Sequence, residues 1–170
     1  MKIQAEKIGD GIWFLNYGSP QSLLVEFKDY LVIIEGPTGD DRSMATIAEA
    51  KRMFPNKPIK YLVNTHVHFD HSGGVRTYVA EGATIVTHEM NKPYYEKAWA
   101  APRTLNPDKM SQANKTATFE TFSDKHVLTD GKRSIEVYPI AGNGHSSAAL
   151  RSTALRNHGA RESVPREASV

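Results

Sequence analysis

Short apolar runs rich in β-branched and aromatic residues open the chain and alternate with turn-forming residues. They cover residues 12–17, 23–27 and 31–34, and a Gly-Ser-Pro segment and a Lys-Asp pair separate them. Runs of this length, bounded by Gly, Pro and Asp, are typical of strands joined by tight turns. The first 34 residues are therefore predicted to form a meander of three strands.

After this meander the pattern predicts helices that alternate with buried strands. One helix starts at Asp40 or Asp41, either of which can cap it, and ends before Pro55. Further helices are predicted from Val75 to a stop at Gly82 and from about Pro93 to Ala100. Strands are predicted at residues 61–63, 83–87, 119–122, 127–128 and 135–140, with a hairpin turn at Asp130-Gly131 and a long loop over residues 101–116. This order predicts a mixed α/β (α+β) fold with helices on one face of the sheet.

Composition narrows the kinds of protein to which this pattern can belong. The 170 residues suit a single domain, and a net charge of +2 argues against a nucleic-acid partner bound through bulk positive charge. The absence of cysteine excludes disulfides, thiolate-bound metals and thiol catalysis. No apolar signal segment follows Met1, and no apolar run approaches the roughly 20 residues that cross a bilayer. We expect a soluble, cytoplasmic chain without membrane partners, and a periplasmic location stays open if the N-terminus is incomplete.

Side chains that bind metals concentrate directly after the predicted buried strand at residues 61–63. His66, His68, Asp70 and His71 place three imidazoles and one carboxylate within six residues. In extended backbone His66 and His68 point to the same side, and the other two follow where the chain turns toward a helix. Imidazole and carboxylate ligands suit zinc, iron or manganese. A run of surface histidines is the alternative interpretation, but four such residues at one strand end favour a metal site.

The segment T-H-V-H-F-D-H-S-G-G, from Thr65 to Gly74, resembles the H-x-H-x-D-H signature of the metallo-β-lactamase superfamily. The order of strands and helices around it is similar to the N-terminal half of that family, over roughly residues 10–145. The resemblance implies the N-terminal half of an αββα sandwich. It does not identify a substrate, because lactamases, thioester hydrolases, nucleases and oxygenases share the motif.

The resemblance also implies roles for individual residues. His66, His68 and His145, the last in a Gly-rich loop after a predicted strand, would bind a first Zn²⁺, while Asp70 and His71 would form part of a second, incomplete site. Three histidines leave a fourth position for water, which is typical of catalytic zinc. The resemblance implies that a metal-bound hydroxide, oriented or generated by Asp70 as the catalytic residue, attacks an ester, thioester, amide or lactam carbonyl of a small-molecule substrate. Iron or manganese are alternative metals.

The chain departs from the family pattern at one supporting position and in its last part. Glu35 stands nearest to the place where the family has an aspartate behind the histidine loop. After residue 145 the chain lacks a further aspartate and enough residues for a second half-domain. Its last 20 residues contain four Arg and two Glu and so carry the whole net charge. We predict that residues 1–146 form an incomplete domain and residues 147–170 a polar, disordered tail, joined near residue 146 by truncation or a frameshift.

An incomplete sandwich would leave one face of its sheet without a partner. That face is predicted to carry Ile12, Phe14, Leu23, Val25 and Ile33. An exposed apolar face of several hundred Å² predicts self-association or aggregation.

Two alternatives to the hydrolase remain open. One is an inactive, truncated remnant that binds a single metal or needs a partner chain. The other is an iron-dependent oxygenase of the same superfamily. We interpret His88 and His126 as surface or packing residues, and Tyr94, Tyr95 and Trp99 as core residues rather than the lining of a substrate cleft.

Overall fold

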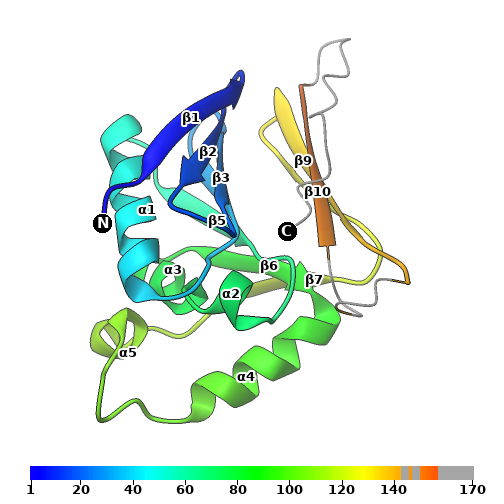
Figure 1. Cartoon of the computed structure of the whole chain (residues 1–170). Helices are drawn as coiled ribbons and strands as arrows, with labels where there is room; N and C mark the ends of the chain where they lie inside the picture. Colours follow the sequence, from blue (N-terminus) through cyan, green and yellow to red (C-terminus); the bar gives the residue numbers. More distant parts are fainter. Residues whose placement is uncertain (143–145, 147–149, 157–170) are drawn as a thin grey trace.

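Two β-sheets pack face to face, and helices cover the outer face of the larger one (Figure 1). This computed structural model describes residues 1–142, 146 and 150–156. The larger sheet has seven strands in the order β1-β2-β3-β4-β5-β6-β7, and the smaller has three in the order β10-β9-β8. The predicted mixed α/β arrangement, with helices on one face of the sheet, is confirmed.

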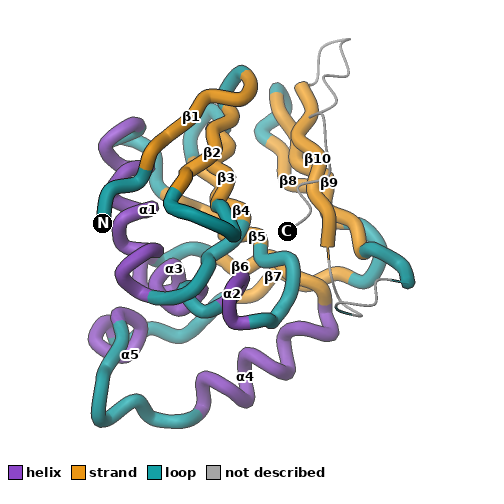
Figure 2. Tube along the Cα trace, viewed as in Figure 1, coloured by secondary structure: helices purple, strands orange, loops and turns teal. Residues whose placement is uncertain are grey.

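Helices and strands alternate in the middle of the chain, and consecutive strands precede and follow this part (Figure 2). The strands are β1 (Gln4–Gly9), β2 (Ile12–Asn16), β3 (Ser22–Glu26), β4 (Leu31–Ile34), β5 (Ile59–Val63), β6 (Thr84–His88), β7 (Phe119–Phe122), β8 (His126–Thr129), β9 (Arg133–Pro139) and β10 (Leu150–Arg156). The helices are α1 (Asp40–Met53), α2 (Phe69–Ser72), α3 (Val75–Glu81), the 3₁₀ turn η1 (Glu89–Asn91), α4 (Lys92–Ala100) and α5 (Lys109–Ala113). None of the helices in the described part of the chain combines the length and apolar character needed to cross a bilayer.

The larger sheet changes direction at β4. Strands β1 to β4 are antiparallel, whereas β4 to β7 are parallel. Leu62 of β5 pairs with Ile33 of β4 on one side and with Ile85 of β6 on the other. Because parallel strands end at the same edge of a sheet, the segments that follow β4, β5 and β6 meet at one edge. The histidine motif follows β5 and therefore lies at that edge.

One apolar core fills the space between the larger sheet and the helices. Leu24, Ile33, Leu62 and Ile85 contribute from the strands, and Tyr78 of α3 is fully buried among them. Alternate residues of a strand point to opposite faces, so these positions face the helices and their neighbours face the other sheet.

The second core lies between the two sheets. Val25, Val63 and Val86 of the larger sheet pack in one buried cluster with Ile135 and Val137 of β9. The smaller sheet therefore covers the face for which the sequence analysis predicts exposure, and that expectation is wrong. Of the residues predicted on this face, Ile12 and Val25 are buried in the core between the sheets. Phe14 and Leu23 are half-buried, and Ile33 faces the helices instead. The prediction of self-association rests on this face being uncovered, and the smaller sheet of the same chain covers it.

Strand β1 and helix α5 are two of the short elements that the sequence pattern does not predict. Strand β1 pairs with β2 although its sequence, QAEKIG, is mostly polar and exposed, because an edge strand needs only one set of backbone partners. Helix α5 interrupts the predicted loop over residues 101–116. Asp108 caps this helix by accepting a hydrogen bond from Ser111 N, and Asn114 ends it in a left-handed conformation. Five residues are too few to show a helical period.

Strand β10 lies beyond the predicted domain boundary at residue 146. It pairs antiparallel with β9 from Leu150, opposite Pro139, to Arg156, opposite Arg133. The sequence analysis predicts no strand there because the segment shows no period of two. Pairing satisfies its backbone groups whatever the side-chain pattern. Residues 157–170 of the predicted tail lie outside the described residues, and the division at residue 146 stays a prediction.

Candidate metal centre

The loop with the histidine motif begins where β5 ends and is fixed by backbone hydrogen bonds. Asn64 N donates to Val86 O of β6 at 2.9 Å, which continues the sheet pairing beyond β5. The amides of His71 and Ser72 donate to His68 O at 3.0 and 2.9 Å, which closes the single turn of α2. His66 and His68 therefore precede α2, His68 with extended backbone angles, and the next two candidate ligands lie on its helical turn.

This geometry brings three of the candidate imidazoles together. The ring centroid of His66 lies 4.8 Å from that of His68 and 4.3 Å from that of His71. His66 and His71 are buried, whereas His68 is exposed. Thr65 Oγ1 lies 3.0 Å from His66 Nδ1 and fixes the orientation of that ring. The cluster has a buried base and one ring at the surface.

Asp70 adds a carboxylate at the edge of the cluster. Its Oδ2 lies 3.3 Å from His71 Nε2, and its side chain is 58% exposed. Two ligands of a tetrahedral zinc ion with bonds of about 2.0–2.1 Å are separated by about 3.4 Å. The spacing of this oxygen and this nitrogen therefore fits two ligands of one cation.

Glu35 lies behind the histidine loop in a buried position directly after β4. Its Oε1 accepts a hydrogen bond of 2.8 Å from Thr65 N, and its Oε2 lies 3.3 Å from His71 Nδ1. Burial lowers the pKa of His71, but the carboxylates of Glu35 and Asp70 raise it and prevail, so the pKa lies above its usual value. Glu35 has a left-handed φ of 71°, which costs a non-glycine residue about 1–2 kcal/mol and is offset by these contacts.

A buried polar network joins this loop to the segment after β6. Asn64 Nδ2 donates to His71 O at 3.2 Å, and the Tyr95 hydroxyl of α4 donates to Asn64 Oδ1. Thr87 Oγ1 donates to Asn64 O at 3.0 Å and accepts from Asn91 Nδ2 at 2.9 Å. The sequence analysis misses these residues as parts of the site. The only local signal is the position of Asn64 between a buried strand and the motif.

Two glycines allow the turn after the motif to lie against the loop that follows β4. A Cβ on Gly73 would lie 2.0 Å from Thr38 O, and one on Gly74 would lie 2.0 Å from Ser43 Oγ. Gly74 N donates to Gly36 O at 2.8 Å, which ties the two segments together. Both glycines have negative φ, so close packing, rather than backbone conformation, requires them.

The remaining histidines have different surroundings. His145, the predicted third ligand of the first site, lies outside the described residues. His88 is buried, accepts from Met90 N at 3.2 Å and lies 3.1 Å from Ser123 O, and His126 contacts Glu120. In the part of the chain that the structure describes, no three His, Asp or Glu side chains form a complete set that could hold a metal ion. The described ligands thus form only part of the predicted set, and their imidazole and carboxylate groups suit zinc, iron or manganese.

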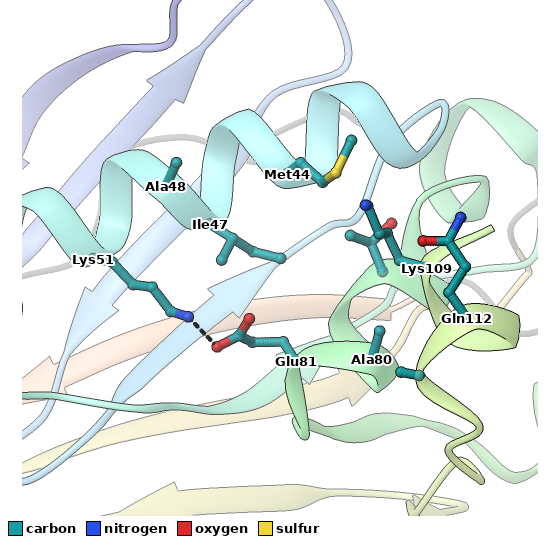
Figure 3. Close-up of a pocket in the computed structure, with 10 residues that line it drawn as sticks. Met44, Ile47, Ala48, Lys51, Ala80, Glu81, Lys109 and Gln112 are labelled. Atoms are coloured by element: carbon teal, nitrogen blue, oxygen red, sulfur yellow. Dashed lines mark ion pairs between the residues drawn. The ribbon is translucent and has the colours of Figure 1, made fainter.

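A separate groove of about 560 Å³ lies on the helical side, between α1, α3 and α5 (Figure 3). Met44, Ile47 and Ala80 line it with apolar surface, and an ion pair joins Lys51 to Glu81 at its rim. None of the motif histidines contributes to this groove. The candidate metal centre and the groove are therefore separate features.

The described structure is an α/β sandwich with a candidate metal centre at the carboxyl edge of its parallel strands. Residues 16–156 match the family model of the metallo-beta-lactamase superfamily, and the chain belongs to this superfamily. The resemblance stated from the motif and the predicted fold class are confirmed.

Solved structures show the same fold. A metallo-beta-lactamase from Pontibacter korlensis has a TM-score of 0.65 and 21% identity, over 91% of this chain and 67% of its own. One from Cronobacter sakazakii has a TM-score of 0.68 and 17% identity, over 91% of this chain and 59% of its own. Identities this low show a shared fold only.

A shorter match joins the chain to a curated enzyme. A linear primary-alkylsulfatase from a Pseudomonas species is 36% identical over 58 residues, which are 34% of this chain and 11% of that enzyme. The match therefore spans about a tenth of the alkylsulfatase's length.

Proposed function

We propose that the chain is a zinc-dependent hydrolase of small-molecule substrates. His66, His68 and His145 would hold one zinc ion, and Asp70 and His71 would contribute to a second site. The observation that carries the proposal is the cluster of three imidazoles with Asp70 beside it, backed by a buried carboxylate at the carboxyl edge of parallel strands. Membership of the superfamily, which includes hydrolases that bind zinc, supports it.

The bound zinc would supply Lewis acidity, lowering the pKa of a water molecule and polarising the substrate oxygen. The protein's own groups carry out the remaining tasks. Asp70 faces solvent and the imidazole cluster at once, so it is placed to orient water and accept its proton. Glu35 holds His71 from the buried side, and the exposed ring of His68 lies where substrate would approach.

The bond that is cleaved belongs to one of two classes. The first is an ester, thioester, amide or lactam carbonyl, as the superfamily motif implies. The second is an alkyl sulfate ester, which the 58-residue match to a linear primary-alkylsulfatase favours. The two classes differ in the atom attacked, carbon or sulfur, and require different positions of the substrate against the same metal centre.

Zinc binding is the first test, because it does not depend on the substrate. Zinc at one hundred times its Kd is expected to raise the free energy of unfolding by about 2.7 kcal/mol and the melting temperature by about 5–10 °C. The variant His68→Ala should lose this shift, because it lacks one of the proposed zinc ligands. It should still fold, since the exposed ring contributes little to the core. The control His126→Gln should keep it. No shift in the parent chain would contradict the proposal.

Turnover then separates the functions. The zinc-loaded chain is assayed with a chromogenic lactam, a thioester, a p-nitrophenyl ester and a linear alkyl sulfate. Hydrolysis of one class, lost in Asp70→Asn, is the expected result. Zinc binding without turnover of any class would support the inactive remnant, and iron-dependent oxygen consumption would support the oxygenase.

A further inference from the structure

We infer that Tyr95 is a positioning residue for the metal centre, acting through Asn64 on the loop that carries the candidate ligands. The inference rests on the proposed function, because it assigns Tyr95 a task at that same centre. Tyr95 is buried beneath the ligand loop and is not assigned a contact with substrate or metal. Its hydroxyl fixes the buried side of the loop instead.

The ring of Tyr95 is held in one place by neighbouring aromatic side chains. Its centroid lies 4.8 Å from that of Trp99 and 6.1 Å from that of Phe119, and the residue is buried. The position of the hydroxyl is thus set by the packing of α4 on the sheet. Burial, followed by the charge of Glu35, raises the pKa of Tyr95 above its usual value, so the hydroxyl stays protonated and donates.

The hydroxyl contacts the part of the ligand loop before α2 directly and reaches the helical turn through Asn64. It donates to Asn64 Oδ1, and it lies 3.4 Å from the carbonyl oxygen of His66. The same Asn64 side chain uses its Nδ2 to hold His71 O at 3.2 Å. One phenol therefore connects the extended part of the loop, with His66, to the helical turn with His71.

Removing the hydroxyl would break this connection on the buried side. Asn64 Oδ1 would lose the donor that orients the amide, in a position without access to water. A buried acceptor without a donor is costly, so the Asn64 side chain would rotate and release His71 O. The two groups of ligands would then lose their fixed relative position, although every ligand would still be present.

The variant Tyr95→Phe tests this role because it keeps the ring and removes only the hydroxyl. Its matched control is Tyr94→Phe, on the neighbouring residue of the same helix. Tyr94 is 50% exposed, so its interpretation as a core residue is wrong. Zinc affinity is measured by competition with a chromophoric chelator. Tyr95→Phe is expected to bind zinc about 10- to 100-fold more weakly, and Tyr94→Phe with unchanged affinity.

Two further measurements separate positioning from general stability. The d–d absorption bands of the cobalt-loaded chain report ligand geometry and should change in Tyr95→Phe only. In the metal-free chain, backbone amides of residues 64–72 should exchange with deuterium faster in Tyr95→Phe, while those of β3 and β4 should not. Equal zinc affinity and an unchanged cobalt spectrum in Tyr95→Phe would overturn the inference.

The outcomes distinguish this inference from the proposed function. If the parent chain binds no zinc, the proposed function fails, and deuterium exchange in the metal-free chain still decides whether Tyr95 holds the loop. If Tyr95→Phe does not fold, Thr87→Val removes the hydroxyl that holds Asn64 O from the other side. That variant should weaken zinc binding by a smaller factor, and parent-like affinity in it would count against the network.

Discussion

Glu35 Oε1 accepts a 2.8 Å hydrogen bond from the backbone N–H of Thr65, and this bond joins the ends of two neighbouring parallel strands. The same carboxylate reaches His71 Nδ1 with its other oxygen, at 3.3 Å. A single buried side chain therefore supports both the beginning and the end of the motif. In the predicted correspondence with the family motif, this glutamate stands nearest to the place of an aspartate.

Replacing Glu35 by Gln should weaken metal binding more than folding. Gln keeps the size of the side chain and an oxygen acceptor for Thr65 N, but it removes the negative charge beside His71. Loss of such a supporting group is expected to lower zinc affinity about 10- to 100-fold, as measured by chelator competition. The control Glu96→Gln changes an exposed carboxylate on α4 and should bind like the parent chain. Unchanged affinity in Glu35→Gln would show that the charge is dispensable.

The ion pair between Asp108 and Arg76 predicts loss of stability at acid pH. Burial would raise the pKa of Asp108, but hydrogen bonds from Arg76 and Ser111 outweigh it and hold the pKa well below its usual value. Because the folded-state pKa is depressed, the stabilisation is present above the unfolded-state pKa of about 3.9 and is lost as pH falls toward the folded-state value.

The variant Asp108→Asn isolates this effect, since Asn still caps α5. It should lower the free energy of urea unfolding by about 2 kcal/mol at pH 7. The difference from the parent chain should shrink as the pH is lowered from 5 to 2. Asp124→Asn, at an exposed loop position, should show neither effect. A difference that stays constant with pH would mean that the charge of Asp108 is not responsible.

Gly73→Ala should destabilise the chain by about 1–3 kcal/mol or more, because the new methyl group would overlap Thr38 O at 2.0 Å. The overlapping atom belongs to the backbone, so rotation of a side chain does not relieve the clash. Gly9→Ala is the control, since its Cβ would meet Ile12 at an ordinary 3.6 Å. Thermal unfolding of the two variants measures the contrast, and similar melting temperatures would argue against this packing.

The smaller sheet is expected to be part of the folded core. Ile135→Ala removes a fully buried side chain between the sheets and should cost about 2–5 kcal/mol. Val127→Ala, on the neighbouring strand and 43% exposed, should change stability by less than about 0.5 kcal/mol. Urea unfolding measures both. If Ile135→Ala were as mild as the control, the smaller sheet would not contribute to the cooperative unit.

The parts of the fold that the sequence predicts are those with strong local patterns. The strands at residues 31–34 and 119–122 agree with β4 and β7, because apolar β-branched and aromatic runs mark buried strands. The packing of β9 over the larger sheet depends on contacts between distant residues. Such contacts leave no signal in a single sequence. The expected exposure of the face that carries Val25 rests instead on the missing second half of the family's sandwich, and the structure covers this face with the smaller sheet.

The candidate site also has a part that the sequence predicts and a part that it does not. His66 to His71 are recognisable because four ligand-type residues are adjacent in the chain. Asn64, Thr87 and Tyr95 take part through contacts across as many as 31 residues, so no spacing rule finds them. The assignment of ligands, including His145 beyond the described residues, stays a prediction.

The backbone pairing around β5 also determines where the chain can change in length. Asn64 N bonds to Val86 O and Thr65 N bonds to Glu35, so each position before the motif is tied to a neighbouring strand. A deletion of one residue there would turn His66 to the opposite face of the sheet. Leu105, by contrast, is fully exposed and lies in the loop between α4 and α5, outside both sheets. Insertions and deletions are therefore expected to be tolerated in the loop around Leu105, whereas the edge with the histidines requires a fixed spacing.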